Sequence, residues 1–438
     1  MPTAAFYTLG CKVNQHDSFS LMRLFEAAGF EITPHTRPAD VYIVNSCTVT
    51  AAGERKSLQA LRRFRRQNPG AVVVLCGCFP QAFPEKAEEI EQADIVMGSK
   101  NRAALLGAVT QKLAGKQGRL VDIPAHCQGD TFEDMDAPLL SGRTRAFLKI
   151  QDGCERDCAY CIVPAARGPV RSKPLADIRK RLEELVAAGH KEVVLTGINL
   201  SCYGQDLGLR LSDAVELSCR VEGLNRLRLG SLEPDLITDE DISRWAAFRL
   251  PGPGRAVLCD HFHLCLQSGC ERTLQRMNRR YTAGNYRQTV SRLRAAFPGC
   301  AVTTDIMVGF PGEKQGDHDA SVGFVREMGF ADAHVFVYSP RAGTSAAGLP
   351  DQISAEVAAA RAKDMTAAVE DYRDVFLRSR LGGVYSVLFE SERGGLYCGH
   401  TACHVPVWVR SVGDIRGEVL FVRLTETYED GCIGEVIL

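Results

Sequence analysis

The chain has 438 residues, a formal net charge of −1 and 24 % charged residues. This is the composition of a globular protein with room for two or three domains. It excludes a generally basic surface, so any nucleic-acid contact must be a local patch. The 17 cysteines favour metal or redox chemistry over disulfides, because no secretory signal and no apolar run of a membrane span is found. We expect a cytoplasmic protein with no membrane partner.

Strand and helix patterns alternate through the first hundred residues. Apolar runs at 4–9, 41–45, 72–75 and 94–97 predict strands, and helical patterns cover 14–29 and the stretch up to about residue 66. This alternation predicts a parallel sheet flanked by helices. Residues 115–144 have mixed composition and are predicted to form a linker.

A cysteine follows each of the first three predicted strands: Cys11, Cys47 and Cys78. The carboxyl ends of parallel strands share one edge, where such sheets bind ligands, so we expect the three thiols to converge. Three thiolates suit an iron–sulfur cluster, and the alternative is that they pack as small hydrophobic residues. Cys76 competes as third ligand. We choose Cys78, because Cys76 belongs to the strand and Cys78 follows it in the loop.

Cys154, Cys158 and Cys161 form a C-x3-C-x2-C motif. Three thiolates leave one iron of a four-iron cluster open, and an open metal position is where a ligand binds. Structural zinc sites usually have four Cys or His ligands, and no close Cys or His completes such a set here.

Two further patterns follow the motif. Six strand-like runs alternate with helices and predict a partial (β/α)6 barrel, with its chemistry at the carboxyl ends of the strands. The runs are 146–151, 192–196, 226–231, 261–267, 302–309 and 333–339. After a helix near 354–380, short β-rich runs separated by glycines predict a small antiparallel barrel or sandwich. These runs are 384–389, 405–409, 418–424 and 431–438. The fold class is therefore α/β with an all-β C-terminal module.

Several motifs resemble the radical S-adenosylmethionine (SAM) methylthiotransferase family, and the resemblance covers essentially the whole chain. Residues 8–15 (TLGCKVNQ), 45–50 (NSCTVT) and 76–81 (CGCFPQ) resemble the N-terminal methylthiotransferase domain, and residues 147–168 resemble the radical SAM core. Further matches to the core are found at residues 231–234, 266–269, 305–313 and 338–344. The C-terminal module is similar to a TRAM domain, a small RNA-binding barrel.

The resemblance implies three domains and two clusters. It implies a flavodoxin-like N-terminal domain at 1–114, the linker at 115–144, a radical SAM core at 145–374 and a TRAM domain at 375–438. One [4Fe-4S] cluster on the C-x3-C-x2-C cysteines would cleave SAM to a radical. An auxiliary [4Fe-4S] cluster on Cys11, Cys47 and Cys78 would hold the sulfur that is inserted. SAM is also the methyl donor.

The first two motifs resemble the branch that acts on threonylcarbamoyladenosine in tRNA. The implied reaction methylthiolates C2 of N6-threonylcarbamoyladenosine at position 37, where an unactivated C–H bond requires a cofactor radical. The implied partners are the tRNA anticodon stem-loop, an electron donor and a sulfur source. Phe79, Pro80 and Ala342 depart from the usual pattern of the branch. Alternative substrates are isopentenyladenosine in tRNA and a ribosomal-protein aspartate, and a non-catalytic metal-containing RNA-binding protein is the alternative of another class.

Residues outside the cysteine sets are candidates for cofactor contacts. The predicted SAM-binding residues are Tyr160, Glu233, Gln267, Gly309 and Glu313. Glu233 and Gln267 end predicted strands and can hydrogen-bond SAM, or they are satisfied polar residues. Gly309 can admit the adenine closely, or it belongs to an ordinary turn. Arg167 can pair with a carboxylate or lie in solvent.

Two groups of residues are candidates for RNA contacts. Four arginines on the second helix can bind tRNA phosphates or form a solvated face. They are Arg62, Arg63, Arg65 and Arg66. Near the C-terminus, Trp408 and Tyr397 can stack on bases or fill the core of the β module.

Overall fold

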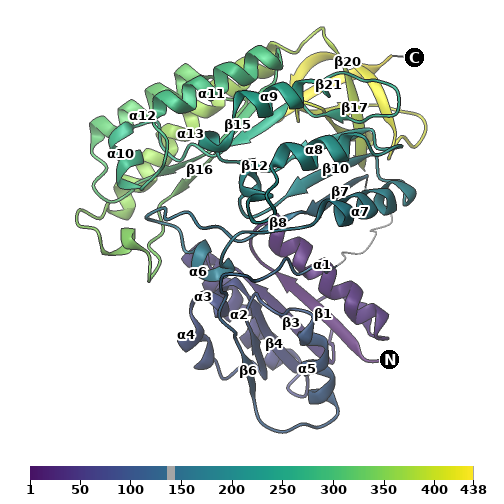
Figure 1. Cartoon of the computed structure of the whole chain (residues 1–438), viewed down its shortest axis with the longest axis vertical. Helices are drawn as coiled ribbons and strands as arrows, with labels where there is room; N and C mark the ends of the chain where they lie inside the picture. Colours follow the sequence, from purple (N-terminus) through teal and green to yellow (C-terminus); the bar gives the residue numbers. More distant parts are fainter. Residues whose placement is uncertain (136–143, 438) are drawn as a thin grey trace. The chain divides into compact units, whose positions relative to one another are not determined.

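The structure is a computed structural model that describes residues 1–135 and 144–437. Residues 136–143, which fall in the predicted linker, and Leu438 lie outside the described part. The described residues form two compact units (Figure 1). The first contains 1–135, 151–173 and 339–348, and the second contains 144–150, 174–338 and 349–437. The predicted domain boundaries stay a prediction.

A six-stranded parallel sheet forms the centre of the first unit, with the strand order β2-β1-β3-β4-β5-β6. Its strands are β1 (Thr3–Thr8), β2 (Glu31–Thr33), β3 (Val41–Ser46), β4 (Val72–Gly77), β5 (Ile95–Met97) and β6 (Leu120–Asp122). The order 2-1-3-4-5 is flavodoxin-like, as predicted. The two edge strands β2 and β6 were not predicted, and β6 lies in the predicted linker. Each has three residues, which is too short for a readable alternation.

Helices cover both faces of this sheet. Helices α1 (Lys12–Ala27) and α5 (Ala104–Leu113) bury residues such as Phe25 and Val109 against one face. Helices α2 (Ala51–Gln67) and α4 (Pro84–Glu88) cover the other face, where Phe64 stacks on Tyr42. Helix α2 begins at Thr50, whose side chain accepts a hydrogen bond from the backbone N–H of Gly53. The side chains that alternate along each strand therefore reach two separate cores.

The second unit contains eight parallel strands in two sheets, ordered β13-β11-β10-β7 and β12-β14-β15-β16. Their bounds are β7 (Arg145–Lys149), β10 (Glu192–Thr196), β11 (Arg226–Leu229), β12 (Ser231–Leu232), β13 (Val257–Leu258), β14 (His261–Leu264), β15 (Ala301–Val308) and β16 (Asp332–Val337). The helices between and after them are α7 (Leu175–Ala187), α8 (Leu211–Cys219), α9 (Asp239–Ala246), α10 (Glu271–Arg276), α11 (Ala283–Ala296), α12 (Gln315–Met328) and α13 (Ala355–Arg378). This is the predicted α/β architecture, and all six predicted runs contain strands.

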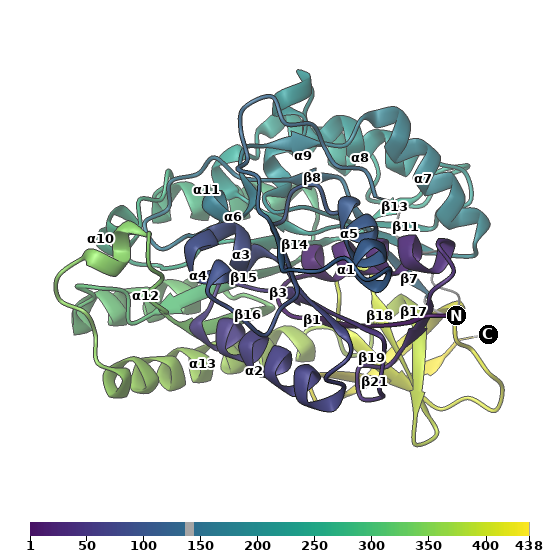
Figure 2. The ribbon, with the colours of Figure 1, turned by 90° about the horizontal axis from the view of Figure 1, so that it is seen from below.

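The C-terminal residues of the second unit form a closed barrel with the order β17-β18-β19-β21-β20 (Figure 2). Its strands are β17 (Val384–Arg393), β18 (Leu396–Thr401), β19 (Pro406–Val409), β20 (Val419–Tyr428) and β21 (Gly431–Val436). The predicted small β barrel is confirmed, but it is not wholly antiparallel, because β19 and β21 pair in parallel. Strand β18 was not predicted. It contains Gly399, where a Cβ atom would lie 2.4 Å from the carbonyl oxygen of Leu388. The close strand contact requires glycine, and glycine obscures the strand pattern.

Candidate functional site

The three cysteines that follow the first strands lie at the carboxyl edge of the N-terminal sheet. Cys11 is the N-cap residue of α1, Cys47 follows β3, and Cys78 begins the short helix α3 (Cys78–Ala82). Strands β1 and β3 are neighbours at the point where the strand order reverses, which is where such sheets bind ligands. The chain therefore presents thiols at the usual binding edge of this fold.

One buried side chain, Asn14, connects the three cysteine loops. Its Nδ2 donates to the carbonyl oxygens of Leu9 at 2.8 Å and Ser46 at 2.9 Å. Its Oδ1 accepts from the thiol of Cys78 at 3.5 Å. Asn14 lies in the first turn of α1, three residues after Cys11, and is 1 % exposed. The amide thus fixes the loops of Cys11 and Cys47 and contacts the third thiol directly.

Gly10 leaves room for the thiol of Cys47. Its φ is +102°, and a Cβ atom there would lie 2.9 Å from both Cβ and Sγ of Cys47. Neither that backbone conformation nor that distance suits another residue. The close approach of the first two cysteine loops therefore depends on glycine at this position.

Burial and neighbouring charges act in opposite directions on these thiols. Burial, and to a smaller extent the nearby thiols, raise the pKa of Cys47 and that of Cys78, and the net pKa of Cys78 is about 11. The guanidinium of Arg167 lowers both pKa values, and Arg341 lowers that of Cys47. Arg341 is held by Glu54 at 2.5 Å. Despite the two neighbouring cations, the net effect at Cys78 is a raised pKa, because burial is the largest influence.

Cys76 has a different environment. It belongs to β4 and packs in the core beneath α1 and α5. Burial, followed by the charge of Asp17, raises its pKa to about 12. Cys78, in contrast, contacts Asn14 and Arg167. The two candidates for the third ligand thus differ in surroundings. Cys76 belongs to the strand, as predicted, whereas Cys78 begins helix α3 instead of lying in a loop.

The C-x3-C-x2-C loop is closed by the two-stranded ribbon of β8 (Gln151–Asp152) and β9 (Arg171–Ser172). The backbone N–H of Cys154 donates to Gly168 at 2.9 Å. A Cβ atom on Gly153, whose φ is +77°, would lie 1.8 Å from the carbonyl oxygen of Pro169. Cys154, Cys158, Tyr160 and Cys161 are half-buried. The loop can therefore close only with glycine before the first cysteine.

Arg167 is the last residue of α6 (Val163–Arg167), and its position corrects the expectation of a solvated arginine. It is 1 % exposed and pairs with Asp17 at 2.8 Å and Asp152 at 3.3 Å. Its Nε donates to Sγ of Cys78 at 3.3 Å. The expected carboxylate pairing exists, but the contact with the sulfur was not predicted. The only sequence signal was an arginine shortly after the cysteine motif.

Three of the predicted SAM-binding residues have partners within the second unit. Glu233 pairs with Arg279. Glu313 accepts from the backbone N–H of Gly309 at 3.1 Å and pairs with Arg361 at 2.8 Å. Gly309 has φ +71°, and a Cβ atom there would meet Ala358 on α13, so this glycine serves helix packing as well. The SAM contacts of these residues stay predictions.

Gln267 differs from that group. It follows β14 with φ +68° and is 7 % exposed. Its backbone N–H donates to the carbonyl oxygen of Asp305 at 2.8 Å. The side-chain Oε1 is buried and has no hydrogen-bond partner among the described residues. A buried acceptor of this kind is expected to find a partner, and a bound ligand can supply one.

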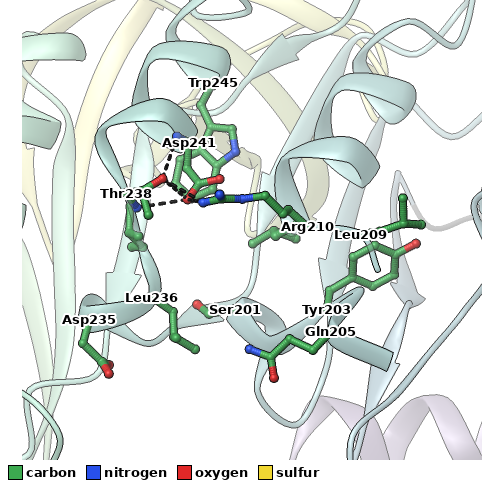
Figure 3. Close-up of a pocket in the computed structure, with 12 residues that line it drawn as sticks. Ser201, Tyr203, Gln205, Leu209, Arg210, Asp235, Leu236, Thr238, Asp241 and Trp245 are labelled. Atoms are coloured by element: carbon green, nitrogen blue, oxygen red, sulfur yellow. Dashed lines mark hydrogen bonds and ion pairs between the residues drawn. The ribbon is translucent and has the colours of Figure 1, made fainter. Parts of the chain in front are cut away.

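A cavity of about 280 Å³ lies among the loops that follow β10 and β12 (Figure 3). Arg210 extends across it and donates to Asp241 at 2.7 Å and Thr238 at 2.8 Å. Ser201 accepts from the backbone N–H of Glu233 at 2.8 Å. These hydrogen bonds connect the two loops, which begin at the carboxyl ends of β10 and β12.

The four arginines of α2 have different roles. Arg65 folds back to Asp94 at 2.6 Å and to backbone carbonyls, and Arg63 lies over the rings of Tyr7 and Phe64. Arg62 and Arg66 are exposed. The run is therefore partly structural, and two of its members remain available for phosphate.

The predicted aromatic pair lies on the barrel wall. Trp408 is half-buried and alternates with the buried Val407 and Val409, so its ring points outward, where it contacts Tyr428 at 5.4 Å between centroids. Tyr397 is also half-buried. Trp408 is thus no core residue of the barrel, and its side chain is partly exposed.

Two family models match the chain. The model of the radical SAM superfamily matches residues 148–325, and that of the uncharacterized protein family UPF0004 matches residues 3–98. With the C-x3-C-x2-C loop, the first match identifies a radical SAM enzyme. Its cofactors are therefore SAM and a [4Fe-4S] cluster.

Relatives of similar length narrow the assignment. The threonylcarbamoyladenosine tRNA methylthiotransferase MtaB of Bacillus subtilis is 36 % identical over 100 % of this chain and 97 % of its own length. The protein of that name from Thermotoga maritima is 34 % identical over 99 % and 96 %. A tRNA-2-methylthio-N(6)-dimethylallyladenosine synthase of Akkermansia muciniphila is 33 % identical over 98 % and 97 %. The chain belongs to the radical SAM tRNA methylthiotransferase family.

Solved structures support the fold. The radical SAM methyltransferase TsrM from Kitasatospora setae aligns with a TM-score of 0.55 at 14 % identity, over 90 % of this chain and 79 % of that one. At this identity the likeness concerns the fold alone. In the described part of the chain, no helix has the length and apolar character to cross a membrane.

Proposed function

We propose that the chain methylthiolates C2 of N6-threonylcarbamoyladenosine at position 37 of tRNA, using SAM and two [4Fe-4S] clusters. One observation carries the proposal of a second cluster: Cys11, Cys47 and Cys78 follow three neighbouring parallel strands and lie at one sheet edge, apart in sequence from the C-x3-C-x2-C loop. Full-length relatives named for threonylcarbamoyladenosine support the choice of substrate.

The donor set fits an auxiliary cluster held by Cys11, Cys47 and Cys78. All three donors are sulfur, which iron–sulfur clusters prefer. Asn14 and Gly10 fix the loops of the first two, and Arg167 and Arg341 favour the thiolate forms by lowering the thiol pKa values. Three ligands leave one iron open for the sulfur that is transferred. Cys76, packed in the core, is not proposed as a ligand.

The radical chemistry is assigned to Cys154, Cys158 and Cys161. When bound, SAM and the cluster supply the radical that an unactivated C2–H bond requires. On the protein side, Gly153 and the β8–β9 ribbon shape the ligand loop. We assign the unpartnered Oε1 of Gln267 as an acceptor for a SAM hydroxyl or ammonium group, because a buried acceptor needs a donor.

Substrate binding is assigned to two surfaces. Arg62 and Arg66 can contact backbone phosphates, and Trp408 can stack on an unpaired base, as aromatic residues of RNA-binding barrels do. The partners in this proposal are the tRNA anticodon stem-loop, an electron donor and a sulfur source. A tRNA substrate also places the enzyme in the cytoplasm.

Substrate selection provides the test. Anaerobically reconstituted protein is incubated with SAM, sulfide and a reductant, together with equal amounts of two tRNAs, one bearing N6-threonylcarbamoyladenosine and one bearing isopentenyladenosine. Mass spectrometry of the nucleosides is expected to find the methylthio group on the first only. Methylthiolation of the second tRNA alone would refute the proposed substrate and leave the chemistry intact.

A further inference from the structure

Arg167 is a buried cation that touches a proposed cluster ligand. It lies six residues after Cys161, yet its side chain reaches the edge of the N-terminal sheet within the first unit. A guanidinium that is 1 % exposed must be paired and hydrogen-bonded to be tolerated there. Its partners therefore indicate what holds it in place.

The N–H groups of the planar guanidinium donate to four groups. Nη1 donates to Asp17 at 2.8 Å and to Asp152 at 3.3 Å. Nη2 donates to Oδ1 of Asn14, and Nε donates to Sγ of Cys78 at 3.3 Å. Only arginine carries N–H donors in a fixed fork that can serve carboxylates and a sulfur together.

The carboxylates do not belong to Arg167 alone. Arg102 also pairs with Asp17, at 2.6 Å, and with Glu133, at 3.0 Å. The two guanidinium groups thus share Asp17 and Asp152, whereas Glu133 pairs with Arg102 alone. The carboxylates hold Arg167 from one side, and the N–H that remains on Nε is directed at the sulfur.

The ion pair with Asp152 connects Arg167 to the C-x3-C-x2-C loop as well. Asp152 belongs to β8 and precedes Cys154 by two residues, at the base of the C-x3-C-x2-C loop. Arg167 closes the other end of the same loop, where Gly168 accepts from the N–H of Cys154 at 2.9 Å. One side chain therefore connects the base of the radical SAM loop to Cys78.

We propose that Arg167 is a positioning residue of the auxiliary cluster: it orients the Cys78 thiolate, raises the reduction potential of the cluster bound there, and couples this ligand to the loop of Cys154. The inference rests on the auxiliary cluster of the proposed function. A hydrogen bond to a ligand sulfur and a nearby positive charge both favour the more negative, reduced cluster, so they shift its potential upward.

The test is a redox titration of the full-length chain in which Cys154, Cys158 and Cys161 are replaced by alanine, so that only the auxiliary cluster is loaded. The cluster is followed by EPR during reduction with dithionite. Arg167→Gln removes both the positive charge and the fixed set of guanidinium N–H donors. Arg167→Lys keeps the charge and removes only that set of donors. Arg171→Gln is the matched control, because Arg171 also lies near Asp152, at 3.8 Å, and its other polar contacts are with His126 and the carbonyl oxygen of Pro169.

At the potential where the unsubstituted protein is half reduced, Arg167→Gln is expected to raise the ratio of oxidised to reduced cluster about tenfold. For one electron, this ratio corresponds to a fall of about 59 mV in the reduction potential. Arg167→Lys is expected to shift it in the same direction by less, and Arg171→Gln by less than twofold. Equal titrations for the Gln variants at 167 and 171 would overturn the inference.

A second measurement can be made on the chain that retains Arg167 and its buried charge. With arginine labelled by ¹⁵N in the guanidinium group, the reduced auxiliary cluster is expected to show a ¹⁵N coupling in ENDOR spectra, which Arg167→Lys abolishes and Arg171→Gln keeps. Absence of the coupling in the chain that retains Arg167 would also overturn the inference, even if Arg167→Gln fails to fold. If this chain binds no iron, the auxiliary cluster itself is refuted, which iron analysis distinguishes from a loaded cluster that ignores Arg167.

Discussion

Replacing Asn14 by alanine is expected to open the auxiliary site, because this amide connects all three cysteine loops. The substitution removes the hydrogen bonds to Leu9 and Ser46 and the acceptor of Arg167. Each neutral bond contributes about 1 kcal/mol net and the bond to a charged donor about 2 kcal/mol, so the loss is about 4 kcal/mol. That is a large part of the ~5–15 kcal/mol that stabilises a typical domain.

The assay counts iron in the Cys154/Cys158/Cys161→Ala background after anaerobic reconstitution. The chain with Asn14 is expected to hold about four irons and Asn14→Ala about one or fewer, with a lower urea midpoint. Asn68→Ala is the matched control: Asn68 lies between α2 and β4 and donates to the carbonyl oxygen of Ala39, just before β3, at the end of these strands opposite to the cysteines. Retention of about four irons by Asn14→Ala, with an unchanged midpoint, would refute the role of this amide.

Three further predictions concern separate parts of the chain. Gly153→Ala places a Cβ atom 1.8 Å from a backbone oxygen, so reconstituted protein is expected to lose about four of about eight irons. Trp408→Ala removes a stacking platform, so the Kd for tRNA is expected to rise about five- to a hundredfold, or ~1–3 kcal/mol, in binding titrations. Glu192→Gln leaves Arg228 buried and unpaired, which is expected to lower the free energy of unfolding by about 3–5 kcal/mol at pH 7 in urea. Burial opposes the charge of Glu192, but Arg228 and neighbouring arginines depress its pKa below 4.5. The contribution of the ionised Glu192 to the free energy of unfolding is therefore complete above pH 4.5. It is lost as the pH falls through the lowered pKa.

Each of these predictions has its own control. Gly107→Ala, on α5 with no neighbour within 4 Å of the added Cβ, is expected to keep all iron. Tyr428→Phe keeps the ring beside Trp408 and is expected to keep the affinity for tRNA. For Glu192→Gln, the difference from the unsubstituted chain must shrink in acid, and an equal difference at pH 7 and pH 3 would contradict the assigned ion pair.

Local patterns were sufficient to predict the sheet and the cysteine loops. A cysteine directly after a buried strand has its position set by the strand, so the edge at which Cys11, Cys47 and Cys78 lie follows from the sequence. The strands β2, β6, β13 and β18 were missed: the first three have only two or three residues, and β18 contains Gly399. The equally short β5 was predicted, because all three of its residues are apolar. Short edge strands depend on their neighbours and leave little pattern of their own.

The contacts that complete the site depend on distant parts of the chain and could not be predicted. Arg167 is 153 residues from Asn14 and 89 from Cys78, and no periodicity relates positions so far apart. Arg65 belonged to an apparently basic face, but it turns back to Asp94, 29 residues later. A charged residue near a motif can be noted from the sequence, whereas its partner is decided by tertiary packing.

In the proposed reaction two separate thiolate sets have different roles, and one pair of variants distinguishes these roles. Cys78→Ala and Cys76→Ala are reconstituted and supplied with SAM, reductant and tRNA bearing N6-threonylcarbamoyladenosine, and 5′-deoxyadenosine and methylthiolated nucleoside are both measured. Cys78→Ala is expected to form 5′-deoxyadenosine but no methylthiolated product. Cys76→Ala is expected to form both. Methylthiolated product from Cys78→Ala at the level of Cys76→Ala would contradict these roles.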